Sequence, residues 1–524
     1  MWKGLTSQGQ VIYEMHVGTF TPEGTWAAAT DQLPELARAG MTVVELMPVA
    51  DFPGDFGWGY DGVAFFAPTR LYGSPDDFRR FVDRAHAVGL GVILDVVFNH
   101  YGPLENSLPQ FSDDYTTDRH KSEWGGAINF DGKNSGPVRE FFRANAHYWI
   151  DEFHLDGLRF DATQSIIDES ESHILTELVT TAREAGRDRT LFIVAENEPQ
   201  KVRMLRSPAD GGHGMDAVWN DDFHHAAMVR LTGHNEAYYS DFMGTAEEFL
   251  GAVKRGFMYQ GQQSQWQKKP RGTSTRGVPA RAFVTFLQNH DQIANSGLGD
   301  RVDKLCSPGR WRAMTALWLL APQTPMFFQG QEFSASTPFL YFADNMGKQA
   351  GQVARGRLRF LSQFPTLATA EAIAHVAEPA DRSTFERCRL NLAERQTHSQ
   401  SYALHRDLLR LRRDEPVFAR QRADLLDGAT LGSDCLVVRY FGDTEADDRL
   451  LVVNFGNDLR YSPAPQALLA PPAHRVWDII WSTNRVEYGG VGTPPIETED
   501  GWQIMGESAV VLRPIAPSTD GPST

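Results

Sequence analysis

The sequence predicts an α/β protein: a (β/α)8 barrel with a small lobe inserted after the third strand, followed by a C-terminal antiparallel β-sandwich. Apolar strand-like segments alternate with helix-like segments from residue 10 to about residue 413, which is typical of a parallel barrel covered by helices. Residues 91–98 (GVILDVVF) are almost wholly apolar, as expected of a strand that is buried on both faces. After Pro416 the helical spacing stops, and short segments with the alternation of antiparallel strands follow.

Eight segments are predicted as barrel strands, and most of them are separated by a segment with helical spacing. The predicted strands are residues 10–17, 42–49, 91–98, 157–162, 191–195, 217–220, 281–287 and 326–329. The clearest helices are residues 25–39, 74–88, 137–152 and 401–413. The second of these begins with Ser-Pro-Asp-Asp, in which serine can cap the helix and proline fits its first turn.

The same pattern predicts the domain organisation. We expect a catalytic barrel over residues 1–415, a lobe at about 101–136, a β-sandwich over 416–515 and a disordered tail over 516–524. The tail is rich in Pro, Ser and Thr, a composition that cannot form a core. Residues 261–279 are polar and rich in Gly and Arg, so we expect a mobile loop there. Residues 333–380 give no clear pattern.

Composition narrows the function classes. The formal net charge of −17 and the pI of about 5.4 argue against nucleic acid or an anionic membrane as a partner. The most apolar stretch, residues 314–328, is broken by two prolines and a glutamine. Cys306, Cys388 and Cys435 stand far apart without metal-site spacing, which favours a reducing cytoplasm. We expect no cofactor and no metal, and a monomer or weak homodimer.

Polar side chains follow four of the predicted strands, at the end where barrel enzymes carry their active sites. The third strand runs into Asn99 and His100, the fourth contains Arg159 and Asp161, the fifth ends at Glu196, and the seventh leads to Gln-Asn-His-Asp at 288–291. One such ending could be a helix cap. Four endings that deliver carboxylates and imidazoles to one rim indicate an active site.

The carboxylates favour chemistry on a glycosidic bond. Arg159 and Asp161 are two positions apart in a strand and therefore share a face, and an adjacent arginine favours an ionised carboxylate. Asp161 thus suits a nucleophile, although a structural ion pair explains the two residues equally well in isolation. Glu196 has no cation next to it in the sequence, which suits an acid/base carboxyl. A retaining glycosidase needs this pair about 5 Å apart.

Other side chains of the rim suit a sugar ligand. Asp291, His290 and His100 can hydrogen-bond sugar hydroxyls around the reacting carbon. The loop Trp58-Gly59-Tyr60-Asp61, after the second strand, offers flat rings that can stack on a pyranose. A glycine-rich turn with buried aromatic rings is the structural alternative for this loop.

Four of these segments resemble the signature regions of the α-amylase superfamily, glycoside hydrolase family 13: DVVFNH (95–100), GLRFDA (157–162), the Glu196 strand and QNHD (288–291). The resemblance implies that Asp161 is the nucleophile, Glu196 the acid/base and Asp291 the stabiliser of the transition state. It also implies that Arg159, His100 and His290 bind the sugar in subsite −1 and that Tyr60 stacks on it.

Further stretches resemble the maltooligosyltrehalose trehalohydrolase family: YEMHVGTFTPEG (13–24), WNDDFHH (219–225), FLQNHDQIANSGLGD (286–300) and STPFL (336–340). That family cleaves the α-1,4 bond next to a terminal trehalose unit. The resemblance implies a maltooligosyltrehalose substrate, with Trp58, Asp61, Asp221, Asp222 and His225 as further binding residues. Three alternatives stay open: a general α-1,4-glucan hydrolase, a glucan branching transferase and an inactive glucan-binding barrel.

Overall fold

Eight parallel strands form the closed barrel that the sequence predicts. A computed structural model of the protein describes residues 2–122 and 125–517, so most of the predicted tail lies outside the described residues. The strand order is β1-β14-β13-β10-β9-β8-β5-β2. The bounds are β1 Ile12–Met15, β2 Val43–Leu46, β5 Gly91–Val96, β8 Gly157–Phe160, β9 Val194–Ala195, β10 Ala217–Trp219, β13 Phe283–Phe286 and β14 Thr324–Phe328.

Alternation along the strands divides the barrel interior into an apolar layer and a charged layer. Ile12, Val43 and Ile93 belong to one buried cluster inside the barrel, together with side chains of β9, β10, β13 and β14. Two residues further along the same strands stand Glu14, Glu45 and Asp95, and all three are buried. Because residues at i and i+2 share a face, the strands that build the apolar core also carry carboxylates toward their carboxyl ends.

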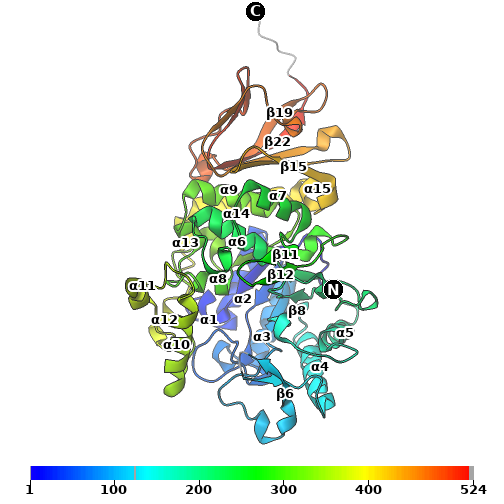
Figure 1. Ribbon diagram of the computed structural model, residues 1–524, viewed down its shortest axis with the longest axis vertical. Coiled ribbons are helices and arrows are strands. Elements are labelled where there is room, and N and C mark those ends of the chain that lie inside the picture. The colour runs from blue at the N-terminus through cyan, green and yellow to red at the C-terminus, as the bar shows by residue number, and fades with distance from the viewer. Residues whose placement is uncertain (1, 123–124, 518–524) are drawn as a thin grey trace, which may run out of the picture.

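Helices surround the barrel, as the sequence predicts (Figure 1). They include α2 Trp26–Ala39, α3 Pro75–Ala87, α4 Ser135–Glu152, α5 Ile174–Gly186, α6 Asp221–Thr232, α7 Ala246–Arg255, α9 Pro308–Leu320 and α14 Ser399–Asp414. The Ser-Pro-Asp-Asp segment forms a capping box at α3, in which Ser74 and Asp77 each accept a hydrogen bond from the other's backbone N–H. The helix α2 ends at Gly40, whose φ of 107° is easily adopted only by glycine.

Three connections depart from plain barrel loops. The lobe after β5 contains the antiparallel strands β6 Thr116–Ser122 and β7 Gly125–Ile128. Residues 261–279, for which the sequence predicts a mobile loop, contain most of a hairpin, β11 Gln260–Ser264 with β12 Lys269–Gly272. The stretch 333–380, which had no clear pattern, includes the helices α10 Lys348–Leu361 and α11 Ala370–His375.

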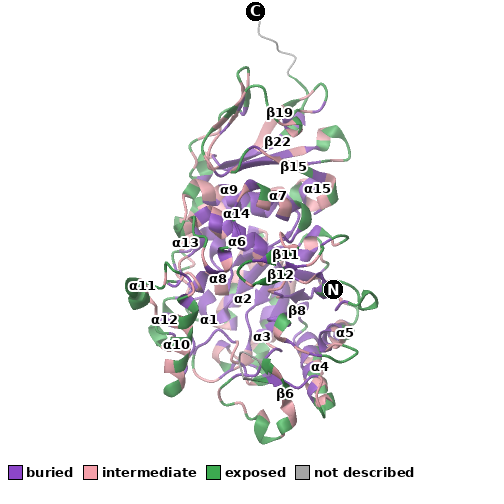
Figure 2. Cartoon of the chain, in the orientation of Figure 1, coloured by how far each residue is buried: buried purple, intermediate pink, exposed green. Residues whose placement is uncertain are grey.

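The C-terminal region forms two antiparallel sheets that pack against each other. One has the order β15-β16-β17-β22-β19 and the other β18-β21-β20. Their bounds are β15 Leu426–Thr430, β16 Cys435–Tyr440, β17 Arg449–Asn454, β18 Leu459–Tyr461, β19 Val476–Ser482, β20 Glu497–Thr498, β21 Gly501–Ile504 and β22 Ser508–Ile515. This region stands on α7, α9 and α14, at the opposite end of the molecule from β6 (Figure 1). Buried residues concentrate in the barrel and its helices, and exposed ones in the peripheral loops (Figure 2).

Candidate active site

Arg159 is the centre of the charged layer and contacts three carboxylates. It lies on β8 with none of its surface exposed. Its NH1 group donates to both oxygens of Asp95, at 2.8 and 2.7 Å, and to Oδ1 of Asp161 at 2.7 Å. Its NH2 group donates to Oε2 of Glu196 at 2.9 Å. The guanidinium also lies 4.1 Å from the centre of the Trp219 ring, a favourable cation–π distance.

Asp161 comes directly after β8, at the point where the strand ends. The strand ends at Phe160, two residues before the predicted end at Ala162, and Ala162 has a left-handed φ of 38°. This turn leaves the Asp161 carboxylate between two donors, Arg159 on Oδ1 and Asn99 on Oδ2 at 2.6 Å. Two hydrogen-bond donors, one of them a guanidinium cation, favour a carboxylate anion, which is what a nucleophile requires.

Glu196 follows β9 and has a different environment from Asp161. Burial raises its pKa to about 8; Arg159 lowers the pKa, while the nearby carboxylates of Asp161 and Asp291 raise it. The sequence offered a different reason, the lack of a neighbouring cation, but the fold brings Arg159 into contact with Glu196 as well. The raised pKa therefore comes from burial and from the neighbouring carboxylates. A protonated carboxyl at neutral pH can serve as a general acid.

His290 and Asp291 stand at the start of the short helix α8 His290–Ala294, which follows β13. His290 Nε2 lies 3.4 Å from Asp291 Oδ2 and 2.9 Å from the Tyr60 hydroxyl. His290 Nδ1 lies 2.6 Å from Glu14 Oε1 on β1. Burial opposes the charged imidazole, but Asp291 and Glu14 outweigh it and raise the pKa of His290 well above its usual value.

The aromatic loop after β2 lies over this group. The Tyr60 ring is stacked on the His290 ring, with 5.2 Å between centroids, and its hydroxyl donates to Asp95 Oδ2 at 2.7 Å. Trp58 donates from Nε1 to the Leu340 carbonyl and stacks on Phe339. His100 Nε2 lies 3.1 Å from the Tyr60 carbonyl oxygen.

The pKa values of Asp61, in this loop, and of its neighbour His100 are also shifted. Burial raises the pKa of Asp61, and the nearby His100 lowers it. Burial lowers the pKa of His100, against the carboxylates of Asp161 and Asp61. The loop residues Trp58 and Tyr60 thus lie against His290, and Asp61 lies near His100.

A cavity of about 640 Å³ opens at this rim. The exposed fractions of the side chains rise from 12% for Asp161 to 21% for Glu196 and 47% for Asp291, so the carboxylates face an accessible space. The residues that line the cavity include Trp58, Glu196, Glu198, Asp221, His225, Tyr238, Trp266, Asp291, Asn295, Tyr341, Arg357 and Phe360. Carboxylates, aromatic rings and an arginine around one cavity can bind an uncharged polyhydroxylated chain.

Asp222 behaves differently from its neighbours in the 219–225 segment. It is fully buried. Its Oδ2 accepts hydrogen bonds from the backbone of Met258 and Tyr259, both at 2.9 Å, and its Oδ1 accepts one from Arg271 Nε at 2.9 Å. Asp222 therefore holds the segment before the hairpin in place, whereas Asp221 and His225 line the cavity itself.

Several residues of the site were not among the sequence candidates. Glu14 and Glu45 are charged residues inside the apolar segments VIYEMHV and TVVELMPV, and that contrast is a signal that could have identified them. Trp266 comes from the hairpin, and Arg357 and Phe360 come from α10. These three lie in segments without a periodic pattern, so no local signal marked them.

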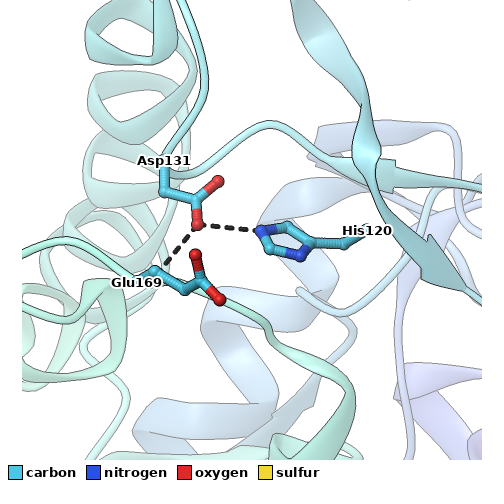
Figure 3. Close-up of side chains that lie close together, drawn as sticks. All are labelled: His120, Asp131 and Glu169. Carbon is cyan, nitrogen blue, oxygen red and sulfur yellow. Dashed lines mark hydrogen bonds and ion pairs between the residues drawn. The ribbon is translucent and has the colours of Figure 1, made fainter.

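One side-chain cluster outside the cavity has the composition of a metal site. His120, Asp131 and Glu169 carry ligand atoms that all lie within 4.8 Å of one another (Figure 3). Arg119 pairs with both carboxylates, with its guanidinium 3.2 Å from Asp131 and 3.2 Å from Glu169. The cluster thus has its own cation, and it is separate from the rim of the cavity.

Among the residues that the structure describes, the helices are too short or too polar to cross a membrane.

Comparison with known proteins identifies relatives over most of the chain. Residues 6–136 match the family model "Alpha amylase, catalytic domain", and residues 423–502 match a domain of unknown function, DUF3459. A malto-oligosyltrehalose trehalohydrolase from Deinococcus radiodurans is 42% identical over 464 residues, which cover 88% of this chain and 74% of the relative. The enzyme of the same name from Saccharolobus solfataricus is 36% identical, covering 82% of this chain and 74% of the relative.

A structural relative and a more distant sequence relative complete the comparison. A crystal structure from Salmonella typhimurium, described as an alpha amylase, superposes with a TM-score of 0.84 at 35% identity. The match covers 98% of this chain and 83% of that one. A 1,4-alpha-glucan branching enzyme from Rhodococcus jostii is 30% identical over 352 residues, which cover 61% of this chain and 48% of the relative.

Proposed function

The chain belongs to the malto-oligosyltrehalose trehalohydrolase family of the α-amylase superfamily, and on that basis we propose that it releases trehalose from maltooligosyltrehalose. The proposed reaction is hydrolysis of the α-1,4 bond next to the terminal trehalose unit. The observation that carries the proposal is the pair of carboxyls on Arg159. Asp161 is held between two donors, and Glu196 has a raised pKa.

In the proposed mechanism, two displacements take place at one anomeric carbon. Glu196 gives its proton to the glycosidic oxygen while Asp161 attacks the anomeric carbon, so the C–O bond breaks and a glycosyl ester forms. Trehalose leaves with that proton. Glu196, now ionised, takes a proton from water, and the resulting hydroxide displaces Asp161. Two inversions restore the α configuration of the glucan.

Arg159 and Asp291 support the charge changes of this reaction. Arg159 stays bonded to Asp161 and Glu196 while the negative charge moves from the nucleophile to the acid/base residue. Asp291, which is half exposed to the cavity, provides negative charge beside the positive charge that develops on the sugar ring. Electrostatic stabilisation of this kind is often the largest contribution to catalysis.

Specificity for trehalose requires a wall that recognises the bend of this non-reducing disaccharide. The cavity residues Asp221, His225, Trp266, Arg357 and Phe360 offer polar and aromatic groups for that wall. A site that hydrogen-bonds particular hydroxyls rejects an analogue without them by several kcal/mol, whereas apolar contact alone discriminates by about 1–3 kcal/mol. We expect kcat/KM to be at least about tenfold higher on maltooligosyltrehalose than on a maltooligosaccharide of equal length, about 1.4 kcal/mol.

A product assay tests this proposal. The purified protein is incubated with each substrate, and trehalose, maltose and branched products are separated by chromatography. Asp161→Asn serves as the control for contaminating glucanases. Equal rates on the two substrates would leave a general α-1,4-glucan hydrolase, and branched products would indicate the transferase activity named for the Rhodococcus jostii relative.

The proposal also covers the location of the protein, its domain bounds and its oligomeric state. Free thiols at Cys306, Cys388 and Cys435 support a cytoplasmic location. We also propose that the barrel domain spans residues 1–415 and the β-sandwich 416–515, and that the protein is a monomer or weak homodimer.

A further inference from the structure

Glu14 is a buried carboxylate next to the site that the proposed mechanism does not use. It lies on β1 in the charged layer of the barrel and is 1% exposed. Both of its oxygens contact His290. Oε1 lies 2.6 Å from the ring nitrogen Nδ1, and Oε2 accepts the backbone N–H of His290 at 3.1 Å. A buried charge costs free energy unless it is paired. Both contacts of the Glu14 carboxyl are made to His290, so the role of Glu14 depends on that residue.

Both ring nitrogens of His290 face hydrogen-bond acceptors. On the Nδ1 side the acceptor is Glu14. On the Nε2 side, the Tyr60 hydroxyl lies at 2.9 Å, and its own hydrogen is donated to Asp95 at 2.7 Å. The Tyr60 oxygen therefore accepts from Nε2. Asp291 Oδ2, at 3.4 Å from Nε2, is an acceptor when ionised. With Glu14 ionised, Nδ1 and Nε2 both face acceptors; a neutral imidazole has only one N–H, so this arrangement fits the doubly protonated ring.

The charges around the ring are consistent with that state. Asp291 and Glu14 raise the pKa of His290 against the effect of burial, and His290 in turn lowers the pKa of Asp291 against the effect of burial. Burial lowers the pKa of the neighbouring His16 to about 4, so His16 is neutral. Titratable and charged groups face the ring or its partners from several elements: Glu14, His16, Glu45, Tyr60, Asp95, Arg159, Asp161, Glu196, Asp221, Tyr238, Asp291, Tyr341 and Arg357.

We propose that Glu14 is a positioning residue that fixes the His290 ring and keeps it doubly protonated, so that the Nε2 hydrogen is directed at Asp291 and the bound sugar. This inference rests on the proposed function, because it assigns His290 and Asp291 to the sugar site. If an amide replaced the Glu14 carboxylate, His290 would keep Asp291 and Tyr60 and could keep an acceptor at Nδ1, but it would lose the negative charge there. Its ring would then lose a proton at a pH nearer the ordinary histidine value of about 6.5.

The strand register supplies a matched control. Glu45 on β2 pairs with Glu14 across the two strands and faces the same interior. Burial raises its pKa well above the usual value, with Arg159 lowering it, and its Oε2 is buried without a hydrogen bond in the structure. Glutamine imitates a protonated glutamate closely. Glu45→Gln therefore changes the same layer without removing a hydrogen-bond partner of His290.

The first measurement needs no substrate. ¹⁵N NMR of the histidine-labelled protein reports the protonation of both ring nitrogens, and the His290 signals are assigned by their loss in His290→Asn. We expect both nitrogens in the wild type and in Glu45→Gln to stay protonated well above the pH at which they titrate in Glu14→Gln, where we expect the ordinary histidine value of about 6.5. A neutral His290 at pH 7 in the wild-type protein overturns the proposal, whatever the fate of the variants.

The second measurement is the pH profile of kcat/KM on whichever α-glucan the wild type hydrolyses. If His290 titrates near 6.5 in Glu14→Gln, about 3% of the enzyme keeps the cation at pH 8. At pH 6 about 76% keeps it, so if activity follows the cation, the loss of activity between pH 6 and pH 8 should be about 25-fold greater than in the wild type. Glu14→Asp should restore part of the alkaline activity. Parallel profiles for Glu14→Gln and the wild type contradict the proposal. Failure to release trehalose contradicts only the proposed substrate, because the NMR titration is independent of it.

Discussion

Replacement of Glu196 by glutamine separates its role as a proton donor from its role in the structure. Arg159 NH2 and the backbone N–H of Ala162 both donate to Oε2 of Glu196, at 2.9 and 2.8 Å. The amide oxygen of glutamine can take the place of Oε2 and keep both hydrogen bonds, so the variant should fold. What it loses is the proton that burial keeps on Glu196 near neutral pH.

The expected magnitude follows from this loss. General acid catalysis contributes about 10²- to 10⁴-fold, or about 3–5 kcal/mol of activation free energy. The leaving group in the natural substrate is a sugar hydroxyl, a poor leaving group without protonation, so kcat should fall by at least about 10³-fold. An α-maltosyl fluoride loses fluoride without an acid, and the first displacement by Asp161 should slow by less than about tenfold.

Rapid-quench measurement of fluoride and mass spectrometry of the protein test this reasoning. Without a general base the second displacement stalls, so Glu196→Gln should give a burst of one fluoride per enzyme and accumulate a glycosyl ester on Asp161. The wild type should lose activity on the natural substrate as pH rises through about 8, where Glu196 loses its proton. The fluoride burst of the variant should show no such decrease at alkaline pH. Equal slowing on both substrates, without a burst, would refute the assignment of Glu196 as the acid.

Three further predictions concern the nucleophile, the stereochemistry and the cavity wall. Asp161→Asn keeps the volume but removes the nucleophile, so turnover should fall below a few per cent of the wild-type rate, with an unchanged circular dichroism spectrum. Proton NMR of the first glucan product should show the α anomer, and a β anomer seen first would exclude the covalent intermediate. Asp221→Ala should reduce the preference for maltooligosyltrehalose over maltooligosaccharide in a kcat/KM comparison. Asp222→Ala instead removes one of the two carboxylate partners of the buried Arg271 guanidinium, which keeps only Glu198, and leaves two backbone N–H groups without their acceptor. It should therefore cost about 3–5 kcal/mol of unfolding free energy in urea titrations; equal stability of the two variants would contradict this.

The sequence by itself determined the barrel and most of its catalytic rim. Period-2 apolar segments must be buried in a sheet, and their alternation with helical segments leaves few arrangements other than a closed parallel barrel. The carboxyl ends of parallel strands meet at one end of such a barrel. Asp161, Glu196 and Asp291 could therefore be assigned to one site, although 130 residues separate the first from the last.

The environments of those residues depended on the tertiary structure. Adjacency in the sequence pairs Arg159 with Asp161, but only the closed barrel brings Arg159 against Glu196 and Asp95 as well. A neighbouring cation does not distinguish Asp161 from Glu196, because Arg159 contacts both. Their difference comes from burial and from neighbouring carboxylates, which are properties of the packed site.

The wall of the cavity and the partner of His290 were also decided only by the fold. Arg357 and Phe360 lie on α10 and Trp266 on the β11–β12 hairpin, in segments whose position depends on packing over the rim and not on a periodic pattern. Glu14 meets His290 across 276 residues of chain because β1 and β13 both border β14 in the closed barrel. Local sequence fixes which face of a strand a side chain takes, but closure of the barrel decides which side chain it meets there.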